Sequence, residues 1–303
     1  MKKFFICTLI LLLTALAACH CALPTAEQDT PVAPAHAPIS LRTPGPTAEP
    51  EGLLRAYESE TLQVYIYETT YNGARIFAAQ VWIRDPGRQI RKASALWGEA
   101  LLAATQMSAE GAVFLVNGSG YMSPDYPNND ETYGDIEENH YTSLGSFVIT
   151  DGEIFRDLGS GFTGISASAG GLLAYENADS AEVAGDNTWA FLRNCLIVKD
   201  GTVRVPEPQE PAYDHEKRVQ DASRPRTVVC RIDANNYVFI IVMAQEECTG
   251  LTLHETAAFC VSYVPDIDWA FNLDGGGSTC MILQGSILAG TPRPIFDILY
   301  LTD

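Results

Sequence analysis

The sequence predicts an α+β domain built mostly from antiparallel β-sheet, with a few helices. The first observation is a series of short apolar or alternating runs, which are typical of strands. The second is that Asn-Gly and Asp-Gly pairs, the strongest short signals of β-hairpins, separate several of these runs. The third is that only two segments have the composition of a helix. Many hairpins and few helices favour antiparallel pairing over βαβ units.

The expected elements follow from local composition and spacing. The Ala- and Leu-rich segment 96–109 predicts a helix, and so does 253–263, which Thr252 and Glu255 open as a capping box. Residues 123–141 are polar, acidic and aromatic and predict a long surface loop. Strands or hairpins are predicted, in chain order, at 61–69, 75–84, 113–116, 146–156, 161–175, 188–203, 228–232, 237–243, 281–283 and 295–301.

The most informative stretch is 269–281, in which an apolar run is followed by a carboxylate, three glycines and two hydroxyls. Three consecutive glycines allow close approach to the backbone, and their amides can form an anion-binding concavity. Beside them, Asp274 has three open roles: metal ligand, acid or base, or orienter of a neighbour. The sequence identifies no cofactor with certainty, and a divalent metal is one open alternative. The other interpretation is a tight Asp-Gly turn between two strands, although such a turn needs only one or two glycines.

The N-terminus predicts export and a lipid anchor. Lys2 and Lys3 precede an apolar run over 4–16, which is the pattern of a signal peptide. The run ends on Leu-Ala-Ala-Cys and resembles a bacterial lipoprotein signal, which implies cleavage before Cys19 and acylation of its thiol. Ordinary secretory cleavage is the alternative. We therefore expect a signal peptide over 1–18, a disordered Pro/Ala/Thr-rich tether over 19–50 and one domain over 51–303, attached to the outer surface of the cell membrane.

Charge and cysteine content narrow the classes of partner. The formal net charge of −19 argues against nucleic acid or anionic lipid as the main partner, so the lipid anchor is the expected membrane contact. No C-x-x-C pair occurs, which argues against a structural zinc site. Outside the cell, the remaining cysteines can be disulfides or buried free thiols, and the sequence leaves both open. No H-E-x-x-H or G-x-S-x-G motif supports a zinc protease or a triad hydrolase.

The C-terminal third resembles the phosphodiester glycosidase family. The resemblance extends weakly upstream to about Arg75. It implies a single phosphodiester-glycosidase-like domain. The segments that carry it are Pro225-Arg226-Thr227, the strand 237–242, Gly250-Leu251-Thr252-Leu253, the motif Asn272-Leu273-Asp274-Gly275-Gly276-Gly277-Ser278-Thr279 and, upstream, Val116-Asn117-Gly118 with the hairpin 145–156.

The resemblance implies hydrolysis of a sugar 1-phosphodiester, of the N-acetylglucosamine-1-phosphodiester type, in an exopolysaccharide or cell-wall glycan. Asp274 is the expected base or metal ligand, and Asn117 and Asn272 are expected to hold sugar hydroxyls or to orient Asp274. These three are the catalytic candidates, because cleavage at an anomeric carbon needs an activated water and a stabilised oxocarbenium-like state. The expected phosphate-binding groups are Arg226, Gly275, Gly276, Gly277, Ser278 and Thr279.

Four departures from the family pattern support a rival hypothesis. Ser119 stands where relatives commonly carry Asp, and Arg193-Asn194-Cys195 stands where many carry Phe-Gly-Pro. Cys230 replaces a frequent Gly, and Met243-Ala244-Gln245 replaces Asp-Gly-Arg or Asp-Gly-Gln. The rival is a catalytically inactive surface lipoprotein that binds glycan or phosphate on the same scaffold.

Overall fold

The computed structural model describes residues 52–94, 111–122, 142–143, 147–150, 153–157, 162–179, 182–183, 189–190, 195–205, 222–290 and 293–303. Its helical elements are α1 (Pro86–Gln89), α5 (Leu253–Tyr263) and the 3-10 turn η2 (Gly276–Ser278). Its strands are β1 (Leu53–Glu58), β2 (Leu62–Tyr71), β3 (Ala74–Ile83), β4 (Ile90–Ser94), β5 (Ala112–Asn117), β6 (Tyr121–Met122), β7 (Thr142–Ser143), β8 (Phe147–Thr150), β9 (Glu153–Asp157), β10 (Phe162–Ser168), β11 (Gly171–Ala178), β12 (Trp189–Ala190), β13 (Cys195–Lys199), β14 (Thr202–Val203), β15 (Arg226–Arg231), β16 (Asn236–Met243), β17 (Trp269–Asn272), β18 (Cys280–Leu283), β19 (Ser286–Gly290) and β20 (Asp297–Thr302).

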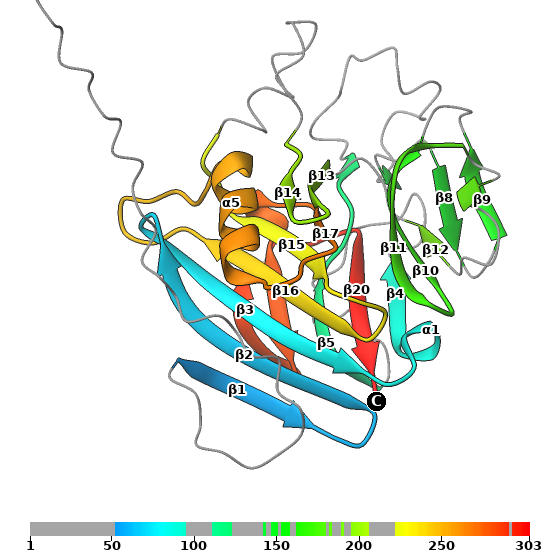
Figure 1. Cartoon of the computed structure of the whole chain (residues 1–303), viewed down its shortest axis with the longest axis horizontal. Helices are drawn as coiled ribbons and strands as arrows, with labels where there is room; N and C mark the ends of the chain where they lie inside the picture. The colour runs from blue at the N-terminus through cyan, green and yellow to red at the C-terminus, as the bar shows by residue number, and fades with distance from the viewer. Residues whose placement is uncertain are drawn as a thin grey trace, which may run out of the picture. The chain divides into compact units, whose positions relative to one another are not determined.

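Two antiparallel sheets position the site. The larger has eight strands in the order β1-β2-β3-β16-β15-β17-β13-β14, and Figure 1 shows β1, β2 and β3 as neighbouring blue and cyan strands. The smaller has five strands in the order β19-β18-β5-β20-β4. In the part of the chain that the structure describes, every strand pairing is antiparallel. The predicted α+β, mostly antiparallel fold class is confirmed.

The main core lies where side chains of the two sheets pack together. Alternate residues of each strand point to one face, so β2 buries Leu62, Val64 and Ile66 in this core. Phe114 of β5 meets Phe239 of β16 edge to face, with ring centroids 5.1 Å apart. Both rings are about 1% exposed, so this aromatic pair joins the smaller sheet to the larger one.

Helix α5 covers the other face of the larger sheet, above β15 and β16 (Figure 1). Its buried stripe includes Ala257, Phe259 and Cys260. The predicted capping box is confirmed: Thr252 accepts a hydrogen bond from the amide of Glu255, and Glu255 accepts one from the amide of Thr252. The face of β15 that points toward α5 is therefore buried, and the side chain of Arg226 lies on this face.

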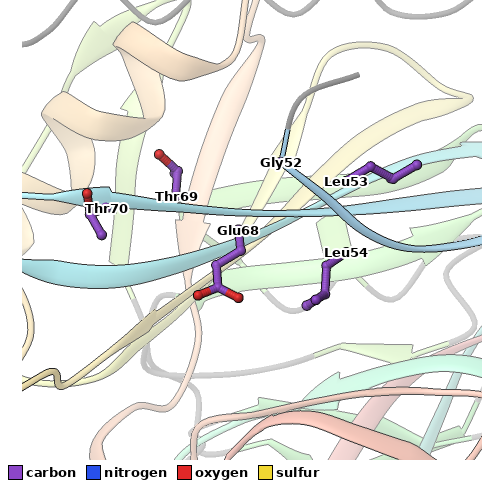
Figure 2. A pocket seen from close by; sticks show the side chains of 6 residues that line it. All are labelled: Gly52, Leu53, Leu54, Glu68, Thr69 and Thr70. Atoms are coloured by element: carbon purple, nitrogen blue, oxygen red, sulfur yellow. The ribbon is translucent and has the colours of Figure 1, made fainter. Parts of the chain in front are cut away.

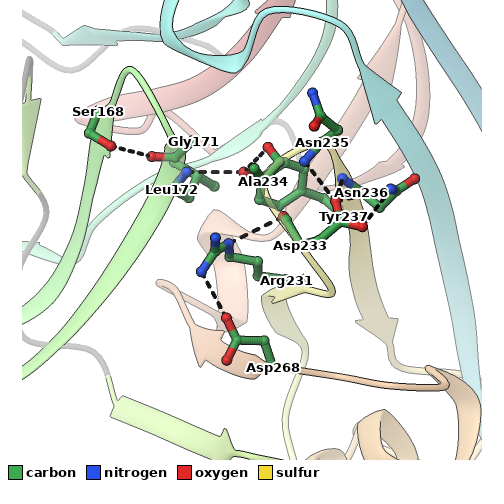
Figure 3. A network of polar contacts seen from close by, with 10 residues as sticks. All are labelled: Ser168, Gly171, Leu172, Arg231, Asp233, Ala234, Asn235, Asn236, Tyr237 and Asp268. Atoms are coloured by element: carbon green, nitrogen blue, oxygen red, sulfur yellow. Dashed lines mark hydrogen bonds and ion pairs between the residues drawn. The ribbon is translucent and has the colours of Figure 1, made fainter.

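A polar network fastens a third, smaller sheet (β11-β10-β12) to the far end of β16 (Figure 3). The Tyr237 hydroxyl donates to the carbonyl of Ala234 at 2.8 Å and accepts from the amide of Leu172 at 3.0 Å. Gly171 has a φ of +95°, and a Cβ there would lie 2.2 Å from the Tyr237 hydroxyl oxygen. Only glycine fits this contact. The contact lies at the opposite end of β16 from the glycine-rich loop, residues 273–279, which follows β17.

Most predicted elements are confirmed. The helix at 253–263 and the hairpins around Asn72-Gly73 and Asp200-Gly201 are present, and these turn residues have positive φ values. Strands β1, β4 and β19 were not predicted. The expected helix at 96–109, the loop at 123–141, the signal peptide and the tether lie outside the described residues. Among the described helices, none is long and apolar enough to cross a membrane.

Candidate active site

The glycine-rich loop connects the two sheets and is not a hairpin turn. It leaves β17, which pairs with β13 and β15 of the larger sheet. It then forms the short turn η2 and enters β18, which pairs with β5 and β19 of the smaller sheet. The interpretation as a tight Asp-Gly turn between paired strands is therefore wrong, because β17 and β18 belong to different sheets.

Three backbone hydrogen bonds hold the loop against neighbouring strands. The amide of Leu273 donates to Thr227 O at 2.8 Å, that of Asp274 to Gly118 O at 3.1 Å, and that of Gly276 to Pro225 O at 2.9 Å. A Cβ on Gly275 would lie 2.6 Å from Pro225 O. The contact is so close that position 275 requires glycine.

The expected anion-binding concavity is not open in this structure. The amide of Gly276 donates to a carbonyl, and the Gly275 amide bonds the Asp274 carboxyl and lowers its pKa. The amides of Ser278 and Thr279 close the 3-10 turn on Gly275 O and Gly276 O. These amides donate to protein groups because the loop lies between two sheets, where buried backbone groups need hydrogen-bond partners within the protein. Gly275 and Gly277 lie in close contacts, and Gly276 has a positive φ of 59°, so the three glycines serve the packing and the backbone conformation of the loop.

Asn117 lies at the centre of the junction and is about 1% exposed. Its Oδ1 accepts from the Thr227 hydroxyl at 2.7 Å and from the amide of Cys280 at 3.0 Å. Its Nδ2 donates to the carbonyl of Asp274 at 2.7 Å. All three bonds go to protein groups on different elements. This geometry fits the second of the two expected roles, which was to orient Asp274.

Asp274 carries the perturbed carboxyl group of the site. Its pKa is raised from the ordinary 3.8 to about 6, chiefly by burial and to a smaller extent by the nearby charge of Asp297. The Ser278 hydroxyl, the Gly275 amide and the charge of Arg293 act in the opposite direction. The residue as a whole is half-buried, and its carboxyl group is surrounded by protein atoms, which is why burial is the largest cause of the raised pKa. A partly exposed acid that titrates near neutral pH suits acid–base chemistry.

Three buried polar atoms around the loop have no hydrogen-bond partner: the hydroxyl oxygens of Ser278 and Thr279 and Oδ1 of Asn272. The Ser278 hydroxyl influences the Asp274 carboxyl without reaching hydrogen-bond geometry. Asn272 uses Nδ2 to bond the carbonyl of Leu273 at 2.8 Å. Buried polar atoms are normally partnered, so their concentration here marks a place that can accept polar groups of a ligand or water.

Arg226 lies on the opposite face of β15 from Asn117. Its neighbour Thr227 points to Asn117, and adjacent strand residues point to opposite faces. Its guanidinium is about 1% exposed and donates to Leu251 O at 3.1 Å and to Ala222 O at 2.8 Å. Burial, followed by the charge of Arg224, lowers its pKa to about 10, so it stays charged at neutral pH. Asn272 shares this face, because it pairs with Val228.

Two residues that the sequence analysis missed stand beside Asp274. Arg293 is exposed, and its side chain packs on the backbone of Gly277. A Cβ added to Gly277 would lie 2.9 Å from Arg293 Cδ and 3.1 Å from Arg293 Nη1. Asp297 is about 1% exposed and is bonded by both the amide and the hydroxyl of Ser119. A signal for Asp297 was available: a lone carboxylate in the apolar run 295–301 requires a buried partner.

The four departures from the family pattern have different surroundings. Ser119 binds the carboxylate of Asp297 at 2.6 Å. Cys195 lies near Arg226, and Cys230 is buried beneath α5 next to Cys260. Met243 packs at the margin of the main core. The five described cysteines are all free thiols, and no group of metal-binding side chains gathers within the described residues.

Two surface hollows within the described residues lie away from the loop. One is lined by residues of β1 and β2, including Leu54, Glu68 and Thr70 (Figure 2). The other lies beside the C-terminal end of α5, around Val264 and Asp268. Neither contains a candidate catalytic residue, so the assignment of the site rests on the chemistry around Asp274.

The comparison with protein families identifies the class to which this fold and loop belong. Residues 110–302, more than half of the 303 residues, match the model of the phosphodiester glycosidase family. The chain belongs to this family, whose members are glycosidases that act on sugar phosphodiesters. The resemblance noted from the motif is confirmed.

Solved structures share the fold at low identity. The chain is similar to the catalytic domain of zebrafish N-acetylglucosamine-1-phosphodiester α-N-acetylglucosaminidase auto-inhibited by its pro-peptide, with a TM-score of 0.61 and 17% identity over 81% of this chain and 84% of that one. It is also similar to a hypothetical protein from Synechocystis, with a TM-score of 0.53 and 11% identity over 81% of this chain and 63% of that one. Curated protein sequences give no match.

Asp274→Asn should stabilise the protein, and the gain should grow with pH. The folded state raises the pKa of Asp274 from 3.8 to about 6, so the carboxylate destabilises the fold as the pH rises through this window. Asparagine removes the charge. We expect the Tm to increase by roughly 2–6 °C near neutral pH and by less near pH ~4.5, because solvent screens part of the effect. Thermal unfolding at both pH values measures this difference, and an equal or reversed gain contradicts it.

Proposed function

We propose that this protein is an extracytoplasmic, membrane-anchored glycosidase that hydrolyses a sugar 1-phosphodiester, of the N-acetylglucosamine-1-phosphodiester type, in an exopolysaccharide or cell-wall glycan. The single observation that carries the proposal is Asp274, a partly exposed acid with a pKa of about 6 on the loop that joins the two sheets. Family membership supplies the reaction class.

In the proposed reaction, the Asp274 carboxylate takes a proton from a water molecule that attacks the anomeric carbon. The bond between this carbon and the bridging oxygen breaks, and its electron pair leaves with the phosphate. The products are a free sugar and a phosphomonoester. Because a phosphate leaves readily, the reaction depends more on an activated water and a stabilised leaving group than on a strong general acid.

Arg293 is the group we assign to the phosphate. It is exposed, it lies across Gly277, and its charge acts on the Asp274 carboxyl. A guanidinium binds phosphate oxygens with two donors at once. Arg226 is not assigned to the phosphate, because its buried guanidinium is bonded to Leu251 O and Ala222 O on the other face of β15. The Ser278 hydroxyl, which lacks a protein partner, is a further donor beside Asp274.

A second candidate function is a catalytically inactive lipoprotein that binds glycan or phosphate. It is favoured by the closed loop, in which the amides of Gly275 and Gly276 and the side chain of Asn117 all serve the protein itself. Such a protein keeps the scaffold and the surface arginine but does not turn over substrate. The following experiment separates the two functions.

Turnover should depend on Asp274 and fall in acid. A soluble form that begins at Ala22 is incubated with an N-acetylglucosamine 1-phosphodiester, with and without divalent metal, and the release of free sugar is followed. Because the carboxylate form is needed, kcat/KM should fall about tenfold per pH unit below about pH 6. Asp274→Asn should reduce it by 100-fold or more, in line with typical losses of about 10²–10⁴.

Asp266→Asn is the matched control, because Asp266 is exposed and asparagine tolerates its positive φ of 53°. It should retain full activity. Saturable binding without turnover, unchanged by Asp274→Asn, would favour the inactive lipoprotein instead.

Arg293→Ala should weaken the binding of the phosphodiester. The loss of a charge-assisted contact is worth about 1.5–3 kcal/mol, which corresponds to roughly 10- to 100-fold in affinity or KM. Arg293→Lys should recover part of the loss. The control is Arg55→Ala, which removes an exposed arginine of β1 that donates to the carbonyl of the neighbouring Leu54. Equal effects of the two alanine variants would remove Arg293 from the site.

The membrane anchor is tested through Cys19. Acylation of this thiol would keep the protein in the membrane fraction, and Cys19→Ser should release it into the soluble extracytoplasmic fraction. Cell fractionation with mass analysis of the N-terminus measures both effects. A Cys19→Ser protein that stays in the membrane fraction, or a wild-type protein without an acyl group, contradicts lipidation.

A further inference from the structure

A buried ion pair stands directly behind the candidate site. Asp297 of β20 is about 1% exposed, and the side chain of its partner, Lys92 of β4, is about 6% exposed. Their charged atoms, Lys92 Nζ and Asp297 Oδ2, are 3.7 Å apart. Burying two charges is costly, and hydrophobic residues of similar size are often as stable. A network of this kind in a small sheet therefore calls for a reason other than stability alone.

Asp297 fixes the segment that follows β5. Its carbonyl accepts from the amide of Gly118 at 2.9 Å, and its carboxylate accepts from the amide of Ser119 at 2.7 Å and from the Ser119 hydroxyl at 2.6 Å. Two consecutive amides beyond the end of the strand are thus directed to one residue. These bonds fix the path of the chain at the point where it meets the glycine-rich loop.

The same segment holds both backbone groups of Asp274. Gly118 O accepts from the Asp274 amide at 3.1 Å, and Asn117 Nδ2 donates to the Asp274 carbonyl at 2.7 Å. A continuous chain of contacts therefore leads from Lys92 through Asp297 and the segment 117–119 to Asp274. No other step is needed to connect the ion pair with the candidate catalytic acid.

We propose that the buried network of Lys92, Asp297 and Ser119 positions Asp274 and is electrostatically coupled to it, which makes Asp297 a positioning residue for the reaction. The catalytic consequence rests on the proposed function. The physical coupling between the two carboxyl groups does not depend on it.

Electrostatics give the coupling a sign. The charged groups that act on Asp274 are Asp297, which raises its pKa, and Arg293, which lowers it. Burial is the largest effect on Asp297 and leaves its pKa above the ordinary value, although Lys92 and the Ser119 donors lower it. With Asp297 ionised against Lys92, its negative charge disfavours a second negative charge on Asp274. Removing the charge of Asp297 must then lower the pKa of Asp274.

The test measures the titration of Asp274 directly in the full-length protein. Aspartate carboxyl carbons are labelled with ¹³C, the Asp274 signal is identified by its loss in Asp274→Asn, and its pKa is measured by NMR. In Asp297→Asn, this pKa should decrease by about 0.5–1 pH unit, the size expected for two charges at moderate separation. An unchanged titration in a folded Asp297→Asn protein overturns the proposal and leaves the ion pair a purely structural contact.

Two further variants keep the test decisive. If Asp297→Asn does not fold because the buried Lys92 loses its carboxylate partner Asp297, the double variant Lys92→Met/Asp297→Asn removes both charges. It should lower the pKa of Asp274 by about the same amount, because Lys92 is not among the charges that act on Asp274. Asp268→Asn is the control, since it breaks the 2.8 Å ion pair with Arg231 at the start of β17, remote from the loop (Figure 3). It must leave the Asp274 titration unchanged.

Enzymatic activity provides a separate readout. Where the protein turns over substrate, the acid limb of its pH–rate profile should move in Asp297→Asn by the same amount as the NMR titration. Where it does not, the proposed function fails, while the NMR measurement still decides whether the two carboxyl groups are coupled.

Discussion

The amide of Asn117 is the contact on which the site depends. Three elements meet there: β15 through Thr227, β18 through the amide of Cys280, and the glycine-rich loop through the carbonyl of Asp274. A buried amide that satisfies a donor and an acceptor on separate elements fixes their relative positions, because leaving any of these groups unpaired costs about 1–3 kcal/mol. The junction between the two sheets is therefore held by buried hydrogen bonds of Asn117 inside an apolar core.

The polar candidate residues separate into two groups. Asn117 and Thr227 face the inner core, whereas Arg226 and Asn272 face the layer covered by α5. Asp274 stands at the edge, where the chain passes from one sheet to the other, and it is the member of the set that retains contact with solvent and a perturbed pKa. The division follows from strand geometry, since neighbouring residues in a strand point to opposite faces.

Much of the fold was predictable from local signals. The hairpin turns, the capping box of α5 and the buried strands depend on residues that are neighbours in sequence, and they appear where expected. The site was only partly predictable. Asp274 and Asn117 were identified as candidates, but the partnership between Ser119 and Asp297 joins residues 178 positions apart, and a single sequence carries no record of such a pairing. The crossing of the loop between sheets was hidden for the same reason, because Asp-Gly looks alike in a hairpin and in a crossover.

The close approach of Gly275 to Pro225 has a wider consequence. A Cβ at this position would lie 2.6 Å from a carbonyl oxygen, so glycine there is demanded by the joining of two sheets and by nothing in the chemistry. The glycine of this motif is then a mark of architecture, while its neighbour Asp274 carries the proposed chemistry. A search of genomes for this motif would therefore find homologues with catalytic activity and homologues without it. Active and inactive homologues are distinguished by the residues that surround the acid and shift its pKa. These residues are scattered along the chain and can change without altering the motif.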